Sequence, residues 1–363
     1  MKTLQLIKIG TQWIVAGLLC LATGCATKQG GKQDYVFYPR PPDEPRIQFL
    51  MSFSRADELG RQSTFTDFVV GKSDFSPISK PYGVALANGK IYVCDTDIAA
   101  LEIVDLAKRK MRYFAPAGEG RMYLPVNIAV DRDGTRYVTD PRRSQVLIYS
   151  DKDEFLGAIG KKDEMKPSGI ALFKDRIYVT DLNSNPEMNS TPSVRVYSKA
   201  GRELLFKIPR DSSEETKLYQ PTNIAVDDKG HVYVSDTGDF NVKVYDSEGA
   251  YLKTIGEAGL GFGRVALGKG VAVDREGRVY LVDARTQVVQ IFDKEGRILT
   301  FFGDSKTDGP GSTALPAGIA IDYDNVSYFQ SYAAPGFKLE YIIIVANQFG
   351  SRKISVFGFG KKT

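Results

Sequence analysis

The stretch Pro221–Gly256, PTNIAVDDKGHVYVSDTGDFNVKVYDSEGAYLKTIG, decides the fold of this chain of 363 residues. It contains the runs NIAVD, HVYVSD, VKVYD and YLKTIG, whose Val, Ile and Tyr residues favour a half-buried pleated surface. The segments between them, DDKG, DTGDFN and DSEG, are rich in the Asp, Gly, Asn and Ser that favour turns. The stretch therefore predicts four short strands joined by three turns.

The same unit recurs along the chain. A repeated four-stranded unit of roughly 40–50 residues is typical of a propeller blade. The sequence thus predicts an all-β protein, a six-bladed β-propeller with four-stranded antiparallel blades. Five complete blades are expected at 81–114, 125–160, 167–208, 221–256 and 269–303. A sixth begins at Pro316 with PAGIAID, continues with YIIIVAN and ends in KISVFGFG, without a fourth strand.

The missing strand has a candidate at the other end of the chain. RIQFLMSF, residues 46–53, reads as a spare strand ahead of the first blade. A ring of sheets needs its first and last blades joined, because free sheet edges promote aggregation. We therefore expect 46–53 to complete blade six beside 353–360. Residues 54–80 are then a connector, with Phe65 and Phe68 turned inward, and 81–363 hold the blades.

The first 25 residues have the parts of a secretory leader. Lys2 and Lys8 precede an apolar run that is too short for a comfortable membrane span. LATGC resembles a bacterial lipobox, which implies a signal peptide at 1–24 and lipidation of Cys25. The alternative is an ordinary signal peptide that leaves a free thiol.

The leader also implies an address. Ala26 follows Cys25 where an Asp would resemble an inner-membrane retention signal, so the resemblance implies an outer-membrane protein held by its lipid anchor. Residues 25–45 would be the lipidated cysteine, a flexible tether and a proline-rich strap, YPRPPDEP, across the propeller. A proline-rich ligand for another domain is the alternative reading of that strap.

Composition excludes several classes of site. The formal net charge is +4, of which Lys2 and Lys8 supply two, so no nucleic-acid partner is expected. Cys94 is the only cysteine outside the leader and its end, which leaves no disulfide framework. His231 is the only histidine, which argues against a histidine-rich zinc site or a histidine-based enzyme.

Two blades carry insertions. Residues 182–193 lengthen a loop of blade three, and residues 327–340 lengthen the loop between the first two strands of blade six. The second insertion holds Tyr328, Phe329, Tyr332 and Phe337. These rings either form an exposed docking patch or, as we expect, fold back over the blade.

One polar position recurs at the end of the second strand of each blade. Because a folding device recurs whereas a catalytic residue need occur only once, we interpret this set as structural, accepting N–H bonds of the following turn. Its members are Asp95, Asp140, Asp181, Asp236, Asp283 and Asn347.

The order PxGIAVD, GxVYVSD, VKVYD, YLKTIG resembles the NHL-repeat six-bladed β-propellers, and with the leader it looks like the outer-membrane NHL-repeat lipoproteins of bacteria. The family includes binding scaffolds and enzymes, so the fold does not decide the function. The resemblance places binding chemistry on the loops around the channel mouth. The candidates there are Tyr82, Asn127, Arg142, Arg143, Ser168, Asn223, Lys269 and Arg285.

Asn127 and Asn223 occupy a position that is Gly in four other blades. Because Gly and Asn both tolerate positive φ, we expect a left-handed backbone there. The alternative is that both amides face the channel as ligands, since gluconolactonase-like propellers hold a divalent cation with asparagines and carboxylates. No carboxylate accompanies them at the strand-entry positions, so no cofactor or metal and no catalytic residue is expected.

The sequence thus favours a non-enzymatic propeller that binds an envelope protein or polymer, the cationic rim suiting an acidic group. The alternative is a metal-dependent lactonase, hydrolase or lyase of the gluconolactonase-like type.

Overall fold

The computed structural model describes residues 35–59, 77–183, 191–211, 213–304 and 309–363. Val36–Thr363 form one compact unit, and Met1–Tyr35 form another, of which only Tyr35 is described. Cys25, the leader and Phe65 and Phe68 of the connector therefore lie outside the described residues. Among the described residues, no helix has the length and apolar character needed to cross a bilayer.

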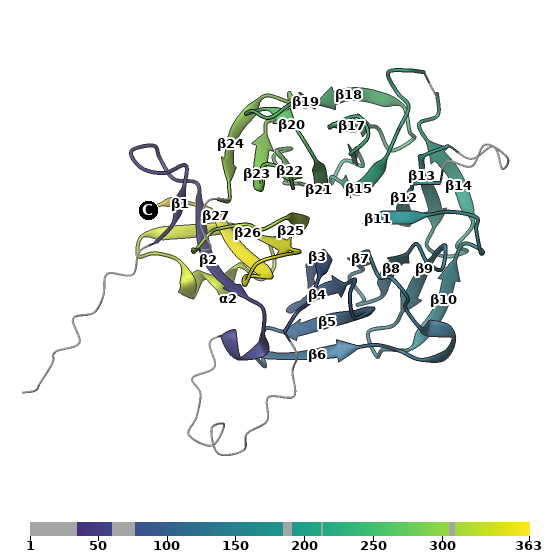
Figure 1. Cartoon of the computed structure of the whole chain (residues 1–363), viewed down its shortest axis with the longest axis horizontal. Coiled ribbons are helices and arrows are strands. Elements are labelled where there is room, and N and C mark those ends of the chain that lie inside the picture. The colour runs from purple at the N-terminus through teal and green to yellow at the C-terminus, as the bar shows by residue number, and fades with distance from the viewer. Residues whose placement is uncertain (1–34, 60–76, 184–190, 212, 305–308) are drawn as a thin grey trace, which may run out of the picture. The chain divides into compact units, whose positions relative to one another are not determined.

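Val36–Thr363 fold into six antiparallel sheets arranged as blades around a common axis (Figure 1). Blade one contains β3 (Pro81–Ala87), β4 (Lys90–Asp95), β5 (Ala100–Asp105) and β6 (Lys110–Phe114). Blade two contains β7 (Asn127–Val130), β8 (Arg136–Asp140), β9 (Gln145–Tyr149) and β10 (Phe155–Ile159). Blade three contains β11 (Pro167–Phe173), β12 (Arg176–Asp181), β13 (Ser193–Ser198) and β14 (Leu204–Ile208).

Blade four contains β15 (Pro221–Val226), β16 (Val232–Asp236), β17 (Asn241–Tyr245) and β18 (Tyr251–Ile255). Blade five contains β21 (Gly268–Val273), β22 (Val279–Asp283), β23 (Val288–Phe292) and β24 (Ile298–Phe302). Between them lies a small parallel pair, β19 (Glu257–Ala258) and β20 (Arg264–Val265). Two short 3-10 helices, η1 (Ala56–Glu58) and η2 (Gly118–Gly120), lie in connections.

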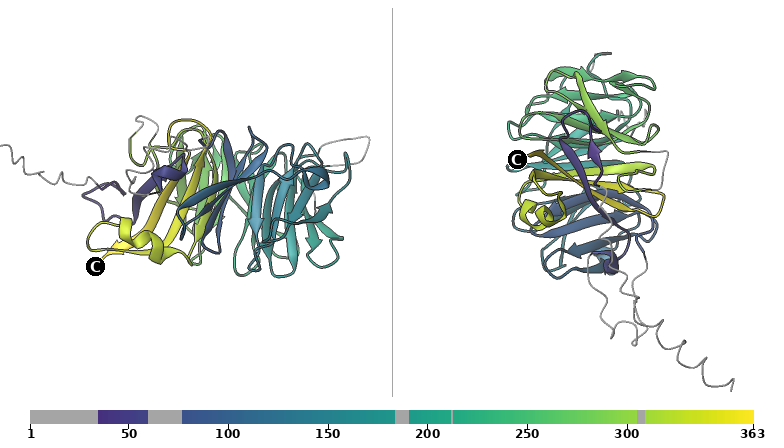
Figure 2. Two further views of the ribbon diagram at one scale, coloured as in Figure 1. Left: turned by 90° about the horizontal axis from the view of Figure 1, so that it is seen from below. Right: turned by 90° about the vertical axis from the view of Figure 1, so that its left-hand side faces the viewer.

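The two ends of the described chain meet in blade six. Its strand order is β1 (Phe37–Tyr38), β2 (Ile47–Phe53), β27 (Ile354–Lys362), β26 (Phe337–Asn347) and β25 (Pro316–Asp322). β2 pairs antiparallel with β27, with Ile47 opposite Phe359 and Phe53 opposite Ile354. Figure 2 shows β2 lying along the sheet that contains the C-terminal strands. The predicted six-bladed, all-β architecture and its closure by the N-terminal strand are confirmed.

Blade six differs from the expected four strands by one addition. β1 pairs with β2 at the outer edge of the sheet, within the segment expected to be a strap. Tyr38 is buried, packs on Phe302 and Phe357, and its hydroxyl donates to the Gly311 carbonyl over 3.2 Å. Aromatic residues favour a strand where they can pack on a hydrophobic surface. Because the prolines begin only at Pro39, they do not prevent Phe37 and Tyr38 from pairing.

The insertion of blade six folds back over its own blade. It forms α2 (Val326–Phe329), η4 (Gln330–Tyr332) and an early start of β26 at Phe337. Phe329 and Phe337 are buried in a core cluster, and Tyr328 and Tyr332 pack against it. The insertion of blade three cannot be compared in the same way, because residues 184–190 lie outside the described residues.

Each pair of neighbouring blades shares a hydrophobic cluster. The cluster between blades one and two, for example, joins Tyr92 and Cys94 to Ile128 and Val138. Six such clusters among the described residues hold the ring together. Because burial of apolar area is the dominant favourable term in folding, these contacts between blades contribute strongly to the stability of the ring.

Candidate functional site

Strand pairing places two sets of loops on one face of the ring. In blade one Pro81 at the start of β3 lies opposite Asp95 at the end of β4, and in blade four Pro221 lies opposite Asp236. The loops entering the first strand and leaving the second strand of a blade are therefore at the same end of its sheet. We call the face that carries these loops the mouth face.

The first strands of neighbouring blades approach one another very closely at the mouth face. A Cβ atom on Gly83 would lie 2.6 Å from the Cα of Asn127, and one on Gly169 would lie 2.7 Å from the Cα of Asn223. Both distances are shorter than any real contact, so only glycine fits at these two positions. Tight backbone packing around the axis, rather than backbone conformation, explains these glycines.

The expectation of a left-handed backbone at Asn127 and Asn223 is wrong. Neither residue has a positive φ, and neither Gly83 nor Gly169 has one. The position is occupied by Gly where the next first strand must come close, and by Asn where the side chain can extend toward the axis.

The side chains of Asn127 and Asn223 contact each other next to these closely packed first strands. The Asn127 Nδ2 donates to the Asn223 Oδ1 over 2.8 Å, although the two residues come from blades two and four. Tyr82 of blade one also lies beside Asn223, whose amide partly offsets the rise in the Tyr82 pKa that burial causes. Blades one and four face each other across a six-bladed ring, so Tyr82 and Asn223 can meet only across the central channel.

Lysines from three segments surround the same opening. Lys269 Nζ lies 5.5 Å from the centroid of the Tyr82 ring and donates to Gln348 Oε1 over 3.2 Å. Lys353 Nζ donates to the backbone carbonyl of Gln348 over 3.0 Å. Burial lowers the pKa of Lys269, and the positive charge of Lys80 lowers it further. Burial also lowers the pKa of Lys353, against an opposing effect of Asp95.

The remaining candidates divide between the channel and the outer loops. Ser168 is buried and its hydroxyl donates to the Thr222 carbonyl over 2.8 Å, so it links blades three and four. Arg143 is turned toward the loop before blade two, where its Nη1 donates to the carbonyls of Glu119 and Arg121 over 2.6 Å each. Arg142 and Arg285 are exposed on the strand-exit loops. The structure therefore brings together Tyr82, Asn127, Asn223 and Lys269, but not the three arginines.

The acidic residues that end the second strands are fully buried and bonded to backbone. Asp283 accepts N–H bonds from Ala266 and Leu267 of the entering loop and from Arg285 and Thr286 of its own loop. Asp95, Asp140, Asp181 and Asp236 accept backbone N–H bonds from the same two kinds of loop. Asn347 accepts from the Ala314 N–H over 3.3 Å. Each Asp brace thus joins the loop that enters a blade to the loop that leaves the second strand of the same blade.

The channel residues do not fit a divalent cation. The Asn223 Oδ1 already accepts a hydrogen bond from Asn127, and the ammonium of Lys269 lies beside Tyr82, which neighbours Asn223. Hard cations take six to eight oxygens, with carboxylates among them. Among the described residues, no group of three or more His, Cys, Asp or Glu side chains could hold a metal ion.

His231 lies away from the mouth face, in the turn between β15 and β16. Its Nδ1 is 2.9 Å from the Asp227 Oδ2, and the Tyr233 hydroxyl donates to the same oxygen over 3.3 Å. In blade five the same turn holds Asp274 and Arg278, paired at 2.6 Å. The histidine therefore occupies the place of an ion-pairing residue at the opposite end of the sheet.

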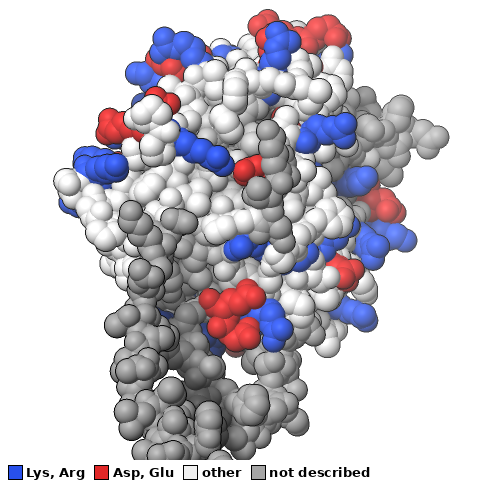
Figure 3. All heavy atoms as spheres, turned by 60° about the vertical axis from the view of Figure 1, so that its left-hand side comes forward, with Lys and Arg blue, Asp and Glu red and all other residues white. Residues whose placement is uncertain are grey.

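Large apolar side chains are exposed around the mouth face. They come from strand-exit loops of three blades and from loops that enter blades two and four: Ile98 (43% exposed), Tyr123 (47%), Tyr219 (45%), Phe240 (40%) and Phe349 (57%). We call these five residues the apolar rim. Figure 3 shows basic and acidic side chains in small mixed groups on one side of the molecule, separated by uncharged surface.

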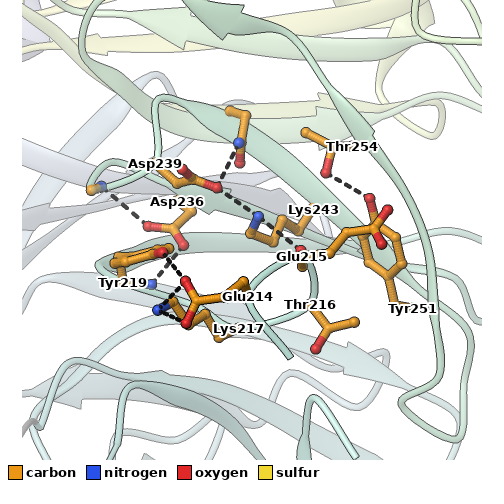
Figure 4. A network of polar contacts seen from close by, with 12 residues as sticks. Glu214, Glu215, Thr216, Lys217, Tyr219, Asp236, Asp239, Lys243, Tyr251 and Thr254 are labelled. Atoms are coloured by element: carbon orange, nitrogen blue, oxygen red, sulfur yellow. Dashed lines mark hydrogen bonds and ion pairs between the residues drawn. The ribbon is translucent and has the colours of Figure 1, made fainter. Parts of the chain in front are cut away.

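One of the rim tyrosines, Tyr219, is held in place by charged neighbours. Tyr219 lies under Lys217, with 4.6 Å from Nζ to the ring centroid, and its hydroxyl donates to Glu214 over 3.3 Å. Figure 4 shows this group beside Asp236, with the Lys243–Asp239 ion pair of 2.6 Å next to it. Side chains fixed in this way lose less conformational entropy when a partner binds.

A family model described as the NHL repeat matches residues 218–245, which run from the loop entering blade four to the end of β17. The chain is a six-bladed β-propeller that contains one match to the NHL repeat. The match overlaps the stretch Pro221–Gly256, whose repetition predicts the fold.

Solved structures share this fold across different activities. A gluconolactonase from Xanthomonas campestris matches with a TM-score of 0.58 and 14% identity, covering 90% of this chain and 97% of that one. Virginiamycin B lyase from Staphylococcus aureus matches with a TM-score of 0.53 and 11% identity, over 78% and 96% of the two chains. A chain of a nidogen/laminin complex matches with a TM-score of 0.51 and 17% identity, over 72% and 94%. Identities this low show the shared fold alone.

Sequence reasoning missed several residues of the mouth face. Lys80 precedes the first strand of blade one, Lys353 precedes β27, and the apolar rim lies in turns that were interpreted only for their polar residues. Alignment of the blades by their strand-end Asp or Asn would have placed Phe349 beside Arg142 and Arg285 as a loop residue. Nothing in the sequence signals that Lys80, Lys269 and Lys353 lie around one opening.

Proposed function

We propose that this propeller is a non-enzymatic binding scaffold of the bacterial cell envelope, anchored in the outer membrane through a lipid on Cys25, that docks a partner protein on its mouth face. The observation that carries the proposal is the apolar rim. Interfaces are enriched in Tyr, Phe and Arg and depleted of other charged residues at their centre. The rim supplies these aromatic residues around a channel whose mouth is already closed by side chains bonded to one another.

The anchor and the address are supported by the leader. A basic start, a short apolar run and LATGC ending at Cys25 match the order of a lipoprotein signal, and Ala26 does not resemble a retention signal. Anchoring through acyl chains requires no membrane-spanning helix. A fixed protein platform beneath or above a membrane is a suitable base for assembling other envelope proteins.

A metal-dependent lactonase, hydrolase or lyase is the alternative function that the fold relatives raise. The donor set around Asn127 and Asn223 does not favour it, because the amide oxygen is engaged and a lysine takes the place of a carboxylate. Adding calcium or zinc should therefore leave the melting temperature unchanged, since a ligand stabilises only the state that binds it. A rise in melting temperature that Asn223→Ala abolishes would support the enzymatic reading.

The proposal is tested by copurification from detergent-solubilised native membranes. The double variant Phe240→Ser, Phe349→Ser removes two rim side chains, and Leu156→Ser, Leu252→Ser is its control, because those leucines are 42% and 47% exposed on outer strands. We expect a protein recovered with the wild type and the control to be lost from the rim variant. Equal recovery with all three chains would contradict docking on the mouth face.

A further inference from the structure

The connection between blades four and five carries an exposed apolar tip. Its residues 258–263, AGLGFG, bear no charge. Leu260 and Phe262 are 75% and 69% exposed, the highest values for large apolar side chains in the described part of the chain. Figure 1 shows the two short strands of this connection, β19 and β20, between β18 and β24, the outer strands of the two blades.

The tip continues into an apolar surface on blade five. The ring centroids of Phe262 and Phe301 lie 4.6 Å apart. Leu299, 53% exposed, lies on the same side of β24 as Phe301, because side chains alternate along a strand. We call Leu260, Phe262, Leu299 and Phe301 the blade-five edge. Contiguous exposed apolar surface of this kind marks a contact with a protein or a membrane.

The base of the tip is fixed to its blade. β19 and β20 pair there, and Glu257 and Arg264 form an ion pair of 3.1 Å beside them. The Gly263 N–H donates to Gln290 Oε1 over 2.9 Å, and Gln290 Nε2 donates to the Arg264 carbonyl over 2.6 Å. Polar groups that are bonded within the protein cost less to remove from water. The tip can therefore enter a poorly hydrated environment while its base stays in place.

The first strand of the described chain lies beside this edge. Tyr38 of β1 packs on Phe302 of β24, with ring centroids 6.2 Å apart. Val36 lies eleven residues after Cys25, so a lipid on Cys25 would keep β1 within about 40 Å of the bilayer, the full reach of such a segment. The anchor would thus hold the ring from the side that carries the blade-five edge, whereas blade two lies on the opposite side of six blades.

We propose that the blade-five edge rests on the lipid bilayer, with Leu260 and Phe262 inserted at the boundary between headgroups and acyl chains. The inference rests on the proposed anchor at Cys25 and adds the orientation of the ring. A flexible tether alone leaves the ring free to turn, whereas a second, apolar contact fixes the side that faces the bilayer. The ring stands on this edge, and its mouth face stays open to a partner.

The test is fluorescence quenching in vesicles that contain the lipidated chain. Trp13 is the only tryptophan and lies in the expected leader, so a mature chain that begins at Cys25 has none. Phe262→Trp places one reporter on the blade-five edge, and Leu156→Trp, at a 42% exposed position of blade two, is its control. With vesicles of phosphatidylethanolamine and phosphatidylglycerol whose acyl chains are brominated, we expect emission from position 262 to shift to the blue and to be quenched. Emission from position 156 should equal that in vesicles without bromine.

Leu260→Ser in the Phe262→Trp chain should reduce the quenching, because it removes the neighbouring inserted side chain, whereas Leu204→Ser on blade three should not. Leu260→Trp is a second reporter if the change at position 262 disturbs the fold. A chain that stays on the vesicles but shows no more quenching at position 262 than at position 156 would retain the anchor and overturn the membrane contact. A blue shift without quenching by brominated lipid would likewise overturn it and assign the edge to a protein. A chain that does not associate with vesicles would reject the anchor and the contact together.

Discussion

Asp283 illustrates how single residues hold this ring. Its carboxylate is fully buried and accepts four backbone N–H bonds, two from the loop entering blade five and two from the loop leaving β22. The negative charge is distributed over those four donors, and the two loops are thereby fixed to each other. The same brace, built from a different Asp or Asn in each blade, sets the shape of the mouth face.

Asp283→Ala should lower the free energy of unfolding by about 2–4 kcal/mol, because several buried N–H groups lose their acceptor together. Asp228→Ala is the control, since Asp228 is exposed in a turn at the other end of blade four. Urea denaturation measures both. A change for Asp283→Ala no larger than for the control would show that the brace contributes little.

Glu102 is a fully buried acidic residue in unfavourable surroundings. It lies in the middle of β5, opposite Val93, where Arg195 and Lys243 occupy the matching positions of blades three and four. Both of its carboxylate oxygens lack a hydrogen-bond partner among the described residues. Burial, followed by the negative charge of Asp95, raises the pKa of Glu102 to about 9.

The raised pKa makes stability depend on pH. Glu102 keeps its proton in the folded chain, whereas the unfolded chain releases it above about pH 4.3. Stability is therefore lost progressively as pH rises from about 4.3 toward 9. Glu102→Gln should be more stable than the wild type by about 1–3 kcal/mol more at pH 7 than at pH 5. A stability difference that is the same at both pH values would contradict a protonated Glu102.

At the scale of strands, the repeat predicts what depends on local pattern. Alternation of Val, Ile and Tyr with turn residues places nearly every strand, since the pattern follows from one buried strand face and repeats in each blade. β1 was not predicted, because two residues before a run of prolines carry no periodicity and pair only where β2 is already in place. The early start of β26 was not predicted either, because it depends on pairing with the last residues of the chain.

The candidate site shows the same limit. Loop positions near the channel could be predicted from the repeat, whereas contacts between residues of blades two and four could not, because they depend on the closed ring. The positive φ expected at Asn127 and Asn223 was wrong for this reason, since the constraint comes from a neighbouring backbone. Arg143 was placed in the correct loop, but its side chain bonds to backbone carbonyls of the loop that enters blade two.

β2 is the strand that closes the ring, because it pairs with the C-terminal strand β27. Ile47 in β2 is completely buried and lies opposite Phe359. Ile47→Ala should therefore lower the free energy of unfolding by about 2–5 kcal/mol. Leu252→Ala, on the exposed side of β18, should change it by less than about 0.5 kcal/mol. Denaturant unfolding followed by far-ultraviolet circular dichroism compares them, and equal effects would mean that β2 is not part of the cooperative unit.

At the scale of the whole molecule, the chain combines a closed ring with the proposed anchor. Lipidation of Cys25 should hold the protein on membranes, so Cys25→Ser should move it to the soluble fraction. The thermal unfolding of this variant in solution should match that of the propeller without an anchor. Fractionation and immunoblotting measure the distribution. Retention of Cys25→Ser on the membrane at the wild-type level would contradict lipidation at this cysteine.

The scaffold proposal makes one face of the ring different from the rest. The most direct measurement is photo-crosslinking in native membranes, with a benzoylphenylalanine residue at position 349 on the apolar rim or at position 252 on an outer strand. We predict a discrete adduct from position 349 that is absent from position 252. No adduct from position 349, or the same adducts from both positions, would contradict docking on the mouth face.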